Sequence, residues 1–249
     1  MNLDKVIAER PTKTVYQDGN LAIKVFNKEY NKADILNEAL NHARVEETDL
    51  NIPKLVEVGM VDGKWAIITE YIEGTNLQQL MEENPDKYDE YMNLFVDLQL
   101  KINSYKVPKL NKLKEKMNSK ISASELDATT RYELHTRLEG MPKHVRLCHG
   151  DFNPSNVIIT KDGTPYIIDW AHATQGNASA DAARTFLYFN LMGEPEKAED
   201  YLKLFCKKSD TARQYVERWI PIVAASQSVK KKEDERELLL KWVDVVDYE

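Results

Sequence analysis

The sequence feature that most constrains the fold is a polar, turn-rich run, His149–Asn156, followed directly by a strand–turn–strand pattern. Val157–Thr160 and Pro165–Asp169 carry the apolar residues of two strands. Asp162-Gly163 between them favours a tight hairpin, because glycine tolerates positive φ. The sequence therefore predicts a hairpin in the middle of the chain, with a polar loop immediately before it.

Three polar residues flank this hairpin: Asp151 in the preceding loop, Asn156 at the start of the first strand, and Asp169 after the second. Folding of the hairpin would bring Asn156 and Asp169 together, facing Asp151. Phosphoryl transfer needs magnesium to neutralise the phosphates, and a group that orients the attacking hydroxyl and accepts its proton. Magnesium takes oxygen ligands, usually one or two from the protein, and an asparagine oxygen with an aspartate carboxylate suits it. The same residue types are also typical of turns and caps, but the combined pattern favours this chemistry.

The first part of the chain predicts a small sheet with one helix. Thr12–Gln17 and Leu21–Phe26 read as paired strands, because the residues between them, Asp18-Gly19-Asn20, form a hairpin signal. Asp34 is the expected N-cap of a helix that runs to about Val45, with apolar residues at helical spacing. Two further strands are predicted, Lys54–Met60 and Lys64–Tyr71, with a turn at Asp62-Gly63.

From Leu77 onward the pattern is mainly helical, apart from the central hairpin. The loop at residues 73–76 marks the expected boundary, so that residues 1–73 form a first lobe and residues 74–249 a second. The predicted fold class is therefore α+β, with a small antiparallel-sheet lobe and a mainly helical lobe. Helices are predicted over Tyr88–Ile102, Ala180–Leu191, Glu196–Lys207, Thr211–Ala225 and Lys230–Val246, and residues 109–140 are also expected to be helical.

Charge and cysteine content argue against several classes of protein. The formal net charge of −7 is unlike that of a general nucleic-acid-binding protein, which would show a basic face. Cys148 and Cys206 are far apart and form no metal-binding pair, which fits a reducing compartment. The sequence shows neither a signal peptide nor an apolar stretch long enough to span a membrane. We therefore expect a cytoplasmic protein with no nucleic-acid or membrane partner; its oligomeric state is not predicted.

The pattern H-G-D-x-x-x-x-N at residues 149–156, with Ile168-Asp169-Trp170, resembles the catalytic loop and metal-binding segment of the aminoglycoside phosphotransferase/choline kinase family. Residues 176–185 also resemble the stretch that follows the metal-binding aspartate in that family. The resemblance implies a two-lobed, protein-kinase-like fold. The roles that it implies are catalytic base or hydroxyl-orienting residue for Asp151, Mg²⁺ ligands for Asn156 and Asp169, and bracing of the catalytic loop for Asp181.

Two segments of the first lobe extend the resemblance. Ala22-Ile23-Lys24 resembles the strand that carries the phosphate-binding lysine, and Glu38 in the following helix is the best candidate to pair with Lys24. Ile67–Gly74 resembles a kinase hinge, which is a buried strand that runs into a connector. Backbone groups would bind the adenine base there, namely the Glu70 carbonyl and the Ile72 amide.

Two departures separate the sequence from protein kinases. A G-x-G-x-x-G loop is missing from the first predicted hairpin, where Gly19 lies between the strands and residues 12–14 lie nearby. Gly150 stands where protein kinases typically carry arginine, and the path from Asp169 to Asp181 is too short for a long regulatory loop. Both departures favour a small-molecule kinase, and the first leaves the phosphate-covering contacts unassigned.

The sequence thus predicts a Mg²⁺-dependent kinase that transfers the γ-phosphoryl group of ATP or GTP to a hydroxyl of a small acceptor. An amino sugar, an amino alcohol and another metabolite are all open as acceptors. A nucleotide-binding pseudokinase or scaffold is the alternative from another class, and a protein kinase is the third hypothesis. The candidate acceptor-lining residues are Asp151, Asn153, Trp170, Trp219 and Trp242, although Trp219 and Trp242 are more typical of a core.

Overall fold

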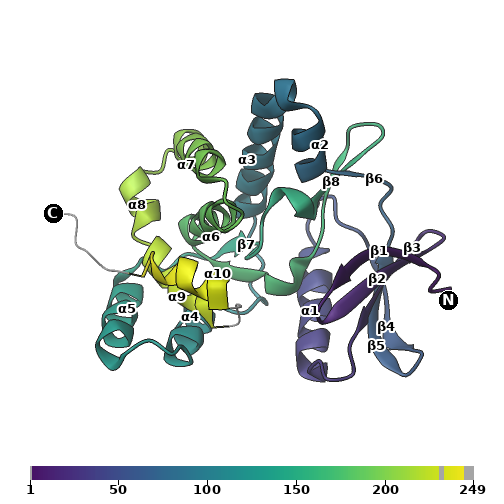
Figure 1. Cartoon of the computed structure of the whole chain (residues 1–249), viewed down its shortest axis with the longest axis horizontal. Helices are drawn as coiled ribbons and strands as arrows, with labels where there is room; N and C mark the ends of the chain where they lie inside the picture. Colours follow the sequence, from purple (N-terminus) through teal and green to yellow (C-terminus); the bar gives the residue numbers. More distant parts are fainter. Residues whose placement is uncertain (1, 230–232, 244–249) are drawn as a thin grey trace. The chain divides into compact units, whose positions relative to one another are not determined.

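Figure 1 traces residues 2–229 and 233–243, the part of the chain that the computed structural model describes. The chain divides into two units: one holds the residues up to Lys87 together with Pro154–Ala173, and the other holds Tyr88–Asn153 and the residues from Thr174 onward. A sheet dominates the first unit and helices dominate the second, which confirms the predicted α+β class. The division differs from the predicted boundary after residue 73, because residues 74–87 and the central hairpin belong to the first unit. The assignment of residues 1–73 to the nucleotide and of residues 74–249 to catalysis and the acceptor stays a prediction.

The first unit is built on a five-stranded antiparallel sheet with the order β1-β2-β3-β5-β4. Gly19 and Gly63, both at positive φ, form the turns of its two predicted hairpins. β1 was not predicted, because it is an edge strand with a charged sequence, in which Val6 is 53% exposed. The strands are β1 (Lys5–Arg10), β2 (Lys13–Asp18), β3 (Leu21–Phe26), β4 (Leu55–Val61) and β5 (Lys64–Glu70).

The two faces of this sheet carry separate apolar clusters. On one face, Ile23 packs with Ala66 and Ile68, all of them buried. On the other face, Phe26 and Ile67 pack against residues of the helix α1 (Lys32–Val45). Since β-strand side chains alternate between faces, Lys24 points to the face that α1 covers.

The helix α1 begins before its predicted cap. The Asn31 side chain accepts a hydrogen bond from Ala33 N at 2.8 Å, so Asn31 is the N-cap in place of Asp34. Asp34 lies in the first turn, where a carboxylate complements the helix dipole. Glu38 is one of the buried residues of α1 and lies on the same side of the helix as the apolar residues that face the sheet.

The predicted central hairpin is present, within a three-stranded sheet of the first unit. β8 (Val157–Thr160) pairs with β9 (Pro165–Ile167) and with β6 (Gly74–Asn76). A Cβ atom at Gly74 would collide with the backbone of β8, so glycine is required there. β9 is two residues shorter than predicted, because the chain turns at Asp169, which has a φ of 63°. The short helices of this unit are α2 (Leu77–Glu83), η1 (Pro85–Lys87), η2 (Pro154–Asn156) and η3 (Trp170–His172).

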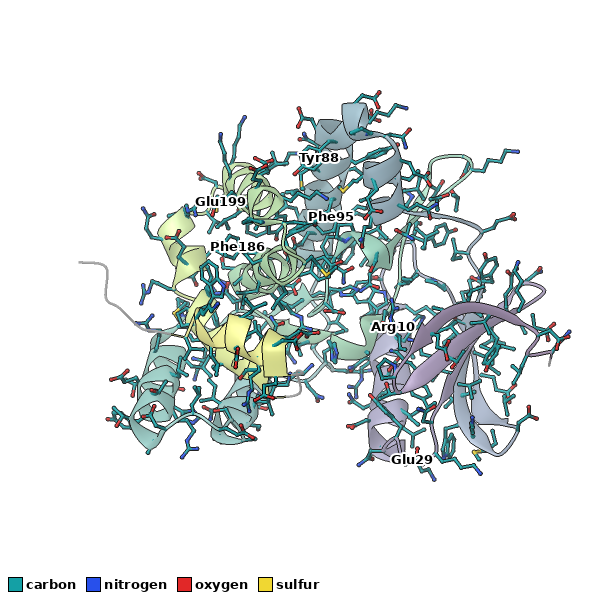
Figure 2. The ribbon with its side chains drawn as sticks, in the orientation of Figure 1. Arg10, Glu29, Tyr88, Phe95, Phe186 and Glu199 are labelled. Carbon is teal, nitrogen blue, oxygen red and sulfur yellow. The ribbon has the colours of Figure 1, made fainter. Side chains whose placement is uncertain are left out.

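The second unit has a core rich in aromatic rings, with Phe95 at its centre (Figure 2). Phe95 stacks on Phe152 with ring centroids 4.5 Å apart, and Phe189 and Tyr201 also pack against it. Two short strands, β7 (Arg146–Cys148) and β10 (Thr174–Gly176), pair within this unit. Its helices are α3 (Tyr88–Ser104), α4 (Leu113–Ser122), α5 (Ala128–Gly140), α6 (Ala178–Leu191), α7 (Pro195–Ser209), α8 (Arg213–Glu217), α9 (Ile220–Ser228) and α10 (Glu233–Leu240).

Three of the predicted helical segments differ in detail. Thr211–Ala225 is divided into α8 and α9 at Pro221, because proline lacks an amide hydrogen and would clash with the carbonyl of the preceding turn. Residues 109–140 contain two helices, α4 and α5. Of the last predicted helix, α10 is present, whereas residues 230–232 and 244–246 lie outside the described residues. None of the helices in the described part of the chain combines the length and apolar character needed to cross a membrane.

Stability is expected to fall on acidification because of His42 on α1. Its ring is buried and its Nε2 lies 2.6 Å from the Pro53 carbonyl oxygen, to which the neutral ring donates a hydrogen bond. Burial lowers the pKa of His42 below its usual value of 6.5, although the Pro53 carbonyl opposes this shift. A depressed folded-state pKa means that the unfolded chain binds the proton first. The stabilisation is therefore complete above about pH 6.5 and is lost as the pH falls through the folded-state pKa.

The test is urea unfolding at a series of pH values between about 7 and 5. We expect His42→Gln to reduce the dependence of the unfolding free energy on pH, because the group that takes up the proton is removed. His144→Gln, which changes an exposed histidine, is the matched control and should leave the slope as in the parent chain. An unchanged slope in His42→Gln would contradict the prediction.

Candidate active site

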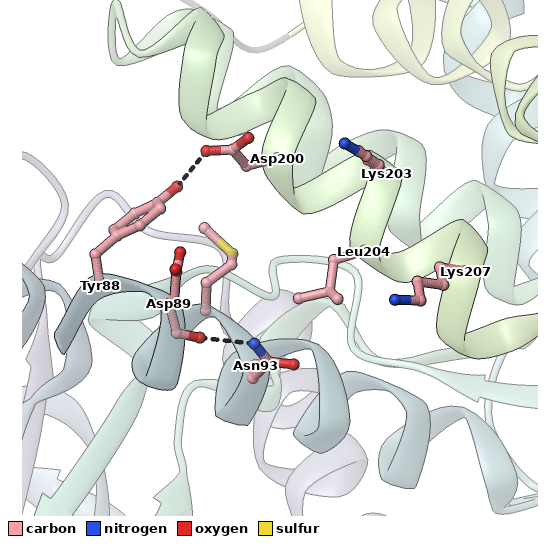
Figure 3. Close-up of a pocket in the computed structure, with 8 residues that line it drawn as sticks. Tyr88, Asp89, Asn93, Asp200, Lys203, Leu204 and Lys207 are labelled. Atoms are coloured by element: carbon pink, nitrogen blue, oxygen red, sulfur yellow. Dashed lines mark hydrogen bonds between the residues drawn. The ribbon is translucent and has the colours of Figure 1, made fainter.

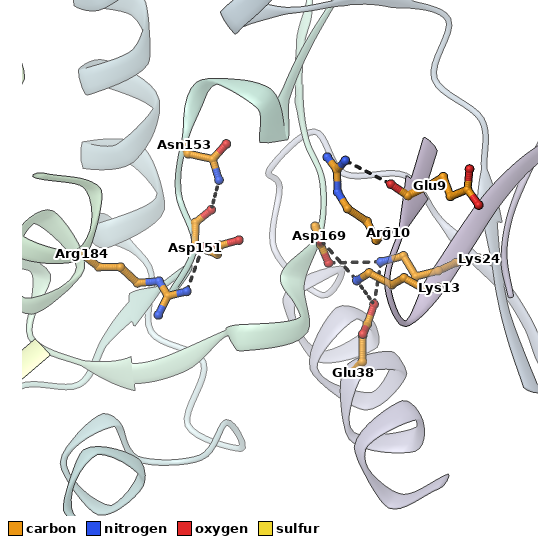
Figure 4. A network of polar contacts seen from close by, with 9 residues as sticks. All are labelled: Glu9, Arg10, Lys13, Lys24, Glu38, Asp151, Asn153, Asp169 and Arg184. Atoms are coloured by element: carbon orange, nitrogen blue, oxygen red, sulfur yellow. Dashed lines mark hydrogen bonds and ion pairs between the residues drawn. The ribbon is translucent and has the colours of Figure 1, made fainter. Parts of the chain in front are cut away.

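A cluster of charged side chains lies on the sheet face that α1 covers (Figure 4). Lys24 on β3 donates from Nζ to Glu38 Oε1 at 2.6 Å and to Asp169 Oδ1 at 3.1 Å. The Lys24 and Glu38 side chains are 20% and 9% exposed, so water screens this pair less than a surface ion pair. The pairing of Lys24 with Glu38 that the sequence predicted is therefore present.

A second lysine, Lys13 at the start of β2, reaches the same two carboxylates. Its Nζ lies 3.6 Å from Asp169 Oδ2 and 3.9 Å from Glu38 Oε1. The register explains this position: Lys13 pairs with Phe26 and Val15 pairs with Lys24, so the two lysines are diagonal neighbours on one face. The sequence analysis gave Lys13 no role, but counting back from the Gly19 turn would have placed it beside Lys24.

The charges of this cluster fix its protonation states. Burial lowers the pKa of Lys24, but the negative charges of Asp169 and Glu38 outweigh burial and raise this pKa above its usual value. Burial raises the pKa of Asp169, but Lys24 and Lys13 outweigh it and hold this pKa well below its usual range. At neutral pH, Lys24 is therefore a cation and Asp169 an anion.

The hairpin places Asn156 next to Asp169, as predicted. The Asn156 carbonyl accepts a hydrogen bond from Ile168 N at 3.0 Å, so Asn156 lies opposite the residue before Asp169. The two side chains offer oxygen atoms, which are the ligands that magnesium prefers. Among the described residues there is no group of three or more His, Cys, Asp or Glu side chains that could hold a metal ion. Magnesium commonly takes only one or two protein ligands, so this pair fits that ion.

Asp151 belongs to the second unit and is held by an ion pair. Arg184 Nη2 on α6 donates to Asp151 Oδ1 at 2.9 Å, with the Arg184 side chain 21% exposed and that of Asp151 36% exposed (Figure 4). Asp151 N donates to His149 Nδ1 at 3.2 Å, and Asn153 Nδ2 donates to the Asp151 carbonyl at 3.0 Å. Arg184 was not among the predicted residues, and its contact arises from the packing of α6. That Asn156 and Asp169, in the first unit, face Asp151 stays a prediction.

Asp181 at the beginning of α6 makes the contacts of a bracing residue. Its Oδ1 accepts a hydrogen bond from Gly150 N at 2.7 Å, and its Oδ2 accepts one from His149 N at 3.0 Å. Gly150 has a φ of 75°, a conformation that glycine adopts without steric cost. Thr185 on the same helix donates to the Phe152 carbonyl at 2.7 Å. The first turns of α6 thus hold the loop that carries Asp151.

The predicted hinge lies where β5 leaves the sheet. Glu70 is the last residue of β5, and its carboxylate accepts a hydrogen bond from Lys54 N at 3.1 Å. Tyr71 N donates to the Asn20 carbonyl at 2.7 Å, which ties the connector to the β2–β3 turn. Ile72 follows and is half-buried. The proposed contacts of the Glu70 carbonyl and the Ile72 amide with a nucleotide base stay predictions.

Two of the candidate acceptor-lining aromatic residues are in the core. Trp219 is fully buried, and Trp170 is 1% exposed with its Nε1 donating to the Ile167 carbonyl at 3.1 Å. Trp170 as an acceptor-lining residue is therefore wrong, because its ring packs inside the first unit. Trp242 is 37% exposed and packs edge-on against Phe186 with centroids 5.4 Å apart, so part of its ring is accessible, unlike that of a core residue.

A surface groove between α3 and α7 lies in the second unit (Figure 3). The Tyr88 hydroxyl donates to Asp200 Oδ2 across it at 3.3 Å, and Lys203 and Lys207 line its α7 side. None of the predicted site residues lines this groove. The cluster around Lys24 and the loop around Asp151 are therefore the features that carry the predicted chemistry.

Comparison with known proteins assigns the class. The sequence matches the phosphotransferase enzyme family over residues 12–215, which is most of the chain. The protein therefore belongs to this family and is a phosphotransferase. Among curated proteins, none matches the sequence.

Solved structures identify the fold. A thermostable mutant of aminoglycoside phosphotransferase APH(4)-Ia, in a ternary complex with ADP and hygromycin B, is 13% identical, with a TM-score of 0.71 over 96% of this chain and 91% of that chain. Choline kinase LicA from Streptococcus pneumoniae is 16% identical, with a TM-score of 0.62 over 97% and 94% of the two chains. A choline/ethanolamine kinase family protein from Mesorhizobium loti is 16% identical, with a TM-score of 0.61 over 94% and 84%. These likenesses confirm the kinase-like fold of the aminoglycoside phosphotransferase and choline kinase type.

Proposed function

We propose that this phosphotransferase is a Mg²⁺-dependent small-molecule kinase. It transfers the γ-phosphoryl group of ATP or GTP to a hydroxyl of a small metabolite, an amino alcohol or an aminoglycoside-like compound. The observation that carries the proposal is the cluster of Lys24, Glu38 and Asp169, a half-buried cation held by two carboxylates. Catalysis of phosphoryl transfer is mostly positioning and electrostatic stabilisation, and such a cluster supplies both. The similar structure with bound ADP supports a nucleotide donor.

The residues of the first unit bind the nucleotide in this proposal. Lys24 binds the α- and β-phosphates, and Glu38 holds the Lys24 ammonium in place through the 2.6 Å hydrogen bond. The Glu70 carbonyl and the Ile72 amide bind the base. Asn156 and Asp169 hold Mg²⁺, which when bound neutralises the phosphate charge.

Asp151 acts on the acceptor. Its carboxylate accepts a hydrogen bond from the acceptor hydroxyl, orients the oxygen for attack, and receives the proton as the new bond to phosphorus forms. Arg184 holds one carboxylate oxygen of Asp151 at 2.9 Å, which restricts the rotation of the side chain. The Asp181 contacts to the backbone of His149 and Gly150 keep the loop in place, so Asp181 is a positioning residue.

A second candidate function is a nucleotide-binding pseudokinase or scaffold without turnover. It would require that one part of the phosphoryl-transfer set is missing, but Lys24, Asp151, Asn156 and Asp169 are all present. A protein kinase is the third candidate, and Gly150 and the short segment before Asp181 count against it. Cytoplasmic location, and the lack of nucleic-acid and membrane partners, stay predictions from composition.

The experiment that tests the proposal is a turnover assay with MgATP and with MgGTP across a panel of amino alcohols, sugars and aminoglycosides. Release of nucleoside diphosphate is measured with and without each acceptor, so that simple hydrolysis is subtracted. We expect acceptor-dependent release that requires Mg²⁺. Nucleotide binding without turnover on any hydroxyl compound would favour the pseudokinase, phosphorylation of a generic protein would favour the protein kinase, and a lack of Mg²⁺-dependent nucleotide binding would contradict all three.

A further inference from the structure

The turn that joins β1 and β2 is poorly suited to bind phosphates through its backbone. Arg10 pairs with Lys13, so the turn consists of Pro11-Thr12 alone. Backbone phosphate cradles use a series of N–H groups, and proline has none. The carbonyl oxygens of Pro11 and Thr12 accept hydrogen bonds from the side chain and the backbone of Asn27, at 2.8 and 2.9 Å, which tie the turn to the end of β3. Phosphate contacts at this hairpin must therefore come from side chains.

Lys13, the first residue after this turn, has an ammonium group with unused donors. Lys24 makes hydrogen bonds to both Glu38 and Asp169, whereas Lys13 stays 3.9 and 3.6 Å from the same carboxylates. These distances are longer than a normal hydrogen bond, and an ammonium carries three donors. Within the described part of the chain, Lys13 has ion pairs but no hydrogen bond from its ammonium. Because its side chain is 20% exposed, the ammonium is also only partly solvated.

The charge balance of the cluster favours an anionic ligand. Lys13 and Lys24 carry two positive charges, and Glu38 and Asp169 carry two negative ones. Asp169 is also the proposed magnesium ligand, and a carboxylate that serves a metal ion compensates the lysines less. The site then holds an excess of positive charge in a partly desolvated place. A polyphosphate brings several negative oxygens close together and would balance this excess.

We infer that Lys13 is a second phosphate-binding residue of the nucleotide site, and that its ammonium binds β- or γ-phosphate oxygens. This inference rests on the proposed nucleotide-dependent function. Lys13 takes the part that backbone amides of a glycine-rich loop play in protein kinases. The two lysines lie diagonally on one sheet face, and each carries a flexible stem, so their ammonium groups can hold neighbouring phosphates from two strands.

The test is calorimetric titration of ADP and AMP-PNP, each with Mg²⁺, into the full chain and its variants. Lys13→Met keeps the length of the side chain and removes its charge, and we expect it to weaken binding of both nucleotides roughly 10- to 100-fold, as for the loss of a charge-assisted hydrogen bond. Lys13→Arg keeps the cation and should stay within about threefold of the parent chain. The double variant Lys13→Met/Lys24→Met should bind ADP no better than it binds adenosine, because no ammonium remains at the phosphates.

Adenosine, which has no phosphate, is the control for folding and for the base site. We expect Lys13→Met to bind adenosine as the parent chain does, which shows that a loss of ADP affinity comes from the phosphates. Lys64→Met, which removes an exposed lysine at the β4–β5 turn, should change neither affinity. If Lys24→Met weakens ADP binding and Lys13→Met does not, the inference is wrong while the proposed function stands. If the parent chain binds no nucleotide, both are wrong.

Discussion

Asp151→Asn is expected to lower kcat for the best acceptor by about 10²- to 10⁴-fold, the range for loss of a general base. Asparagine has the same shape as aspartate and can still contact the acceptor hydroxyl, but it cannot accept the proton. The nucleotide dissociation constant should not change, since the charged cluster that we assign to the phosphates consists of Lys13, Lys24, Glu38 and Asp169. The measurement is steady-state turnover together with calorimetric nucleotide binding.

The matched control for this prediction is Asp97→Asn. Asp97 is an exposed aspartate of the same unit and is also paired with a cation, Lys208, at 2.7 Å. An exposed ion pair contributes about 1 kcal/mol or less, so this variant should keep the parent kcat. Arg184→Gln removes the partner of Asp151 but leaves the carboxylate, and it should retain more activity than Asp151→Asn. An Asp151→Asn chain that turns over at the parent rate would rule out the assignment of Asp151.

Asp169→Asn is expected to lower kcat/KM on the order of 10³-fold, because a preorganised charge at the phosphates is lost. An amide can still offer one oxygen, but it neither compensates Lys24 and Lys13 nor holds Mg²⁺ with a full charge. The effect should also be visible without turnover: Mg²⁺ should strengthen nucleotide binding in the parent chain and have little effect in the variant. Titrations of ADP with and without Mg²⁺ measure this ratio directly.

Asparagine is the substitution of choice because of the backbone at this position. Asp169 has a φ of 63°, in the left-handed region, which asparagine and aspartate tolerate better than other side chains. Asp169→Ala would add a steric cost of about 1–2 kcal/mol and confuse a loss of stability with a loss of function. Thermal unfolding should show Asp169→Asn to be the more stable of the two variants. If Asp169→Asn keeps Mg²⁺-dependent binding and turnover, Asp169 does not serve the metal.

Much of the fold could be predicted because it depends on local signals. The hairpins at Gly19, Gly63 and Gly163 follow from glycine at positive φ between alternating strands. The paired arrangement of Lys24 and Glu38 also followed from the sequence, because a lysine on a central strand and a buried glutamate on the next helix matched a family pattern. β1 did not follow, because an exposed edge strand needs no apolar alternation. The cap of α1 was misplaced by three residues because both Asn31 and Asp34 are residue types that favour helix starts.

The sequence by itself therefore determined the elements around the site, the kinase-like class, and the identity of Lys24, Asp151, Asn156 and Asp169 as the candidate residues. These follow from turn chemistry, periodicity and a motif, all of which act over short stretches of chain. Only the tertiary structure decided that Lys13 joins Lys24 at Asp169, that Arg184 holds Asp151, and that Trp170 is buried. Lys24 and Asp169 are 145 residues apart in the sequence, and their contact depends on how a strand, a helix and a hairpin pack together. Such packing is set by the burial of whole faces, which no local pattern encodes.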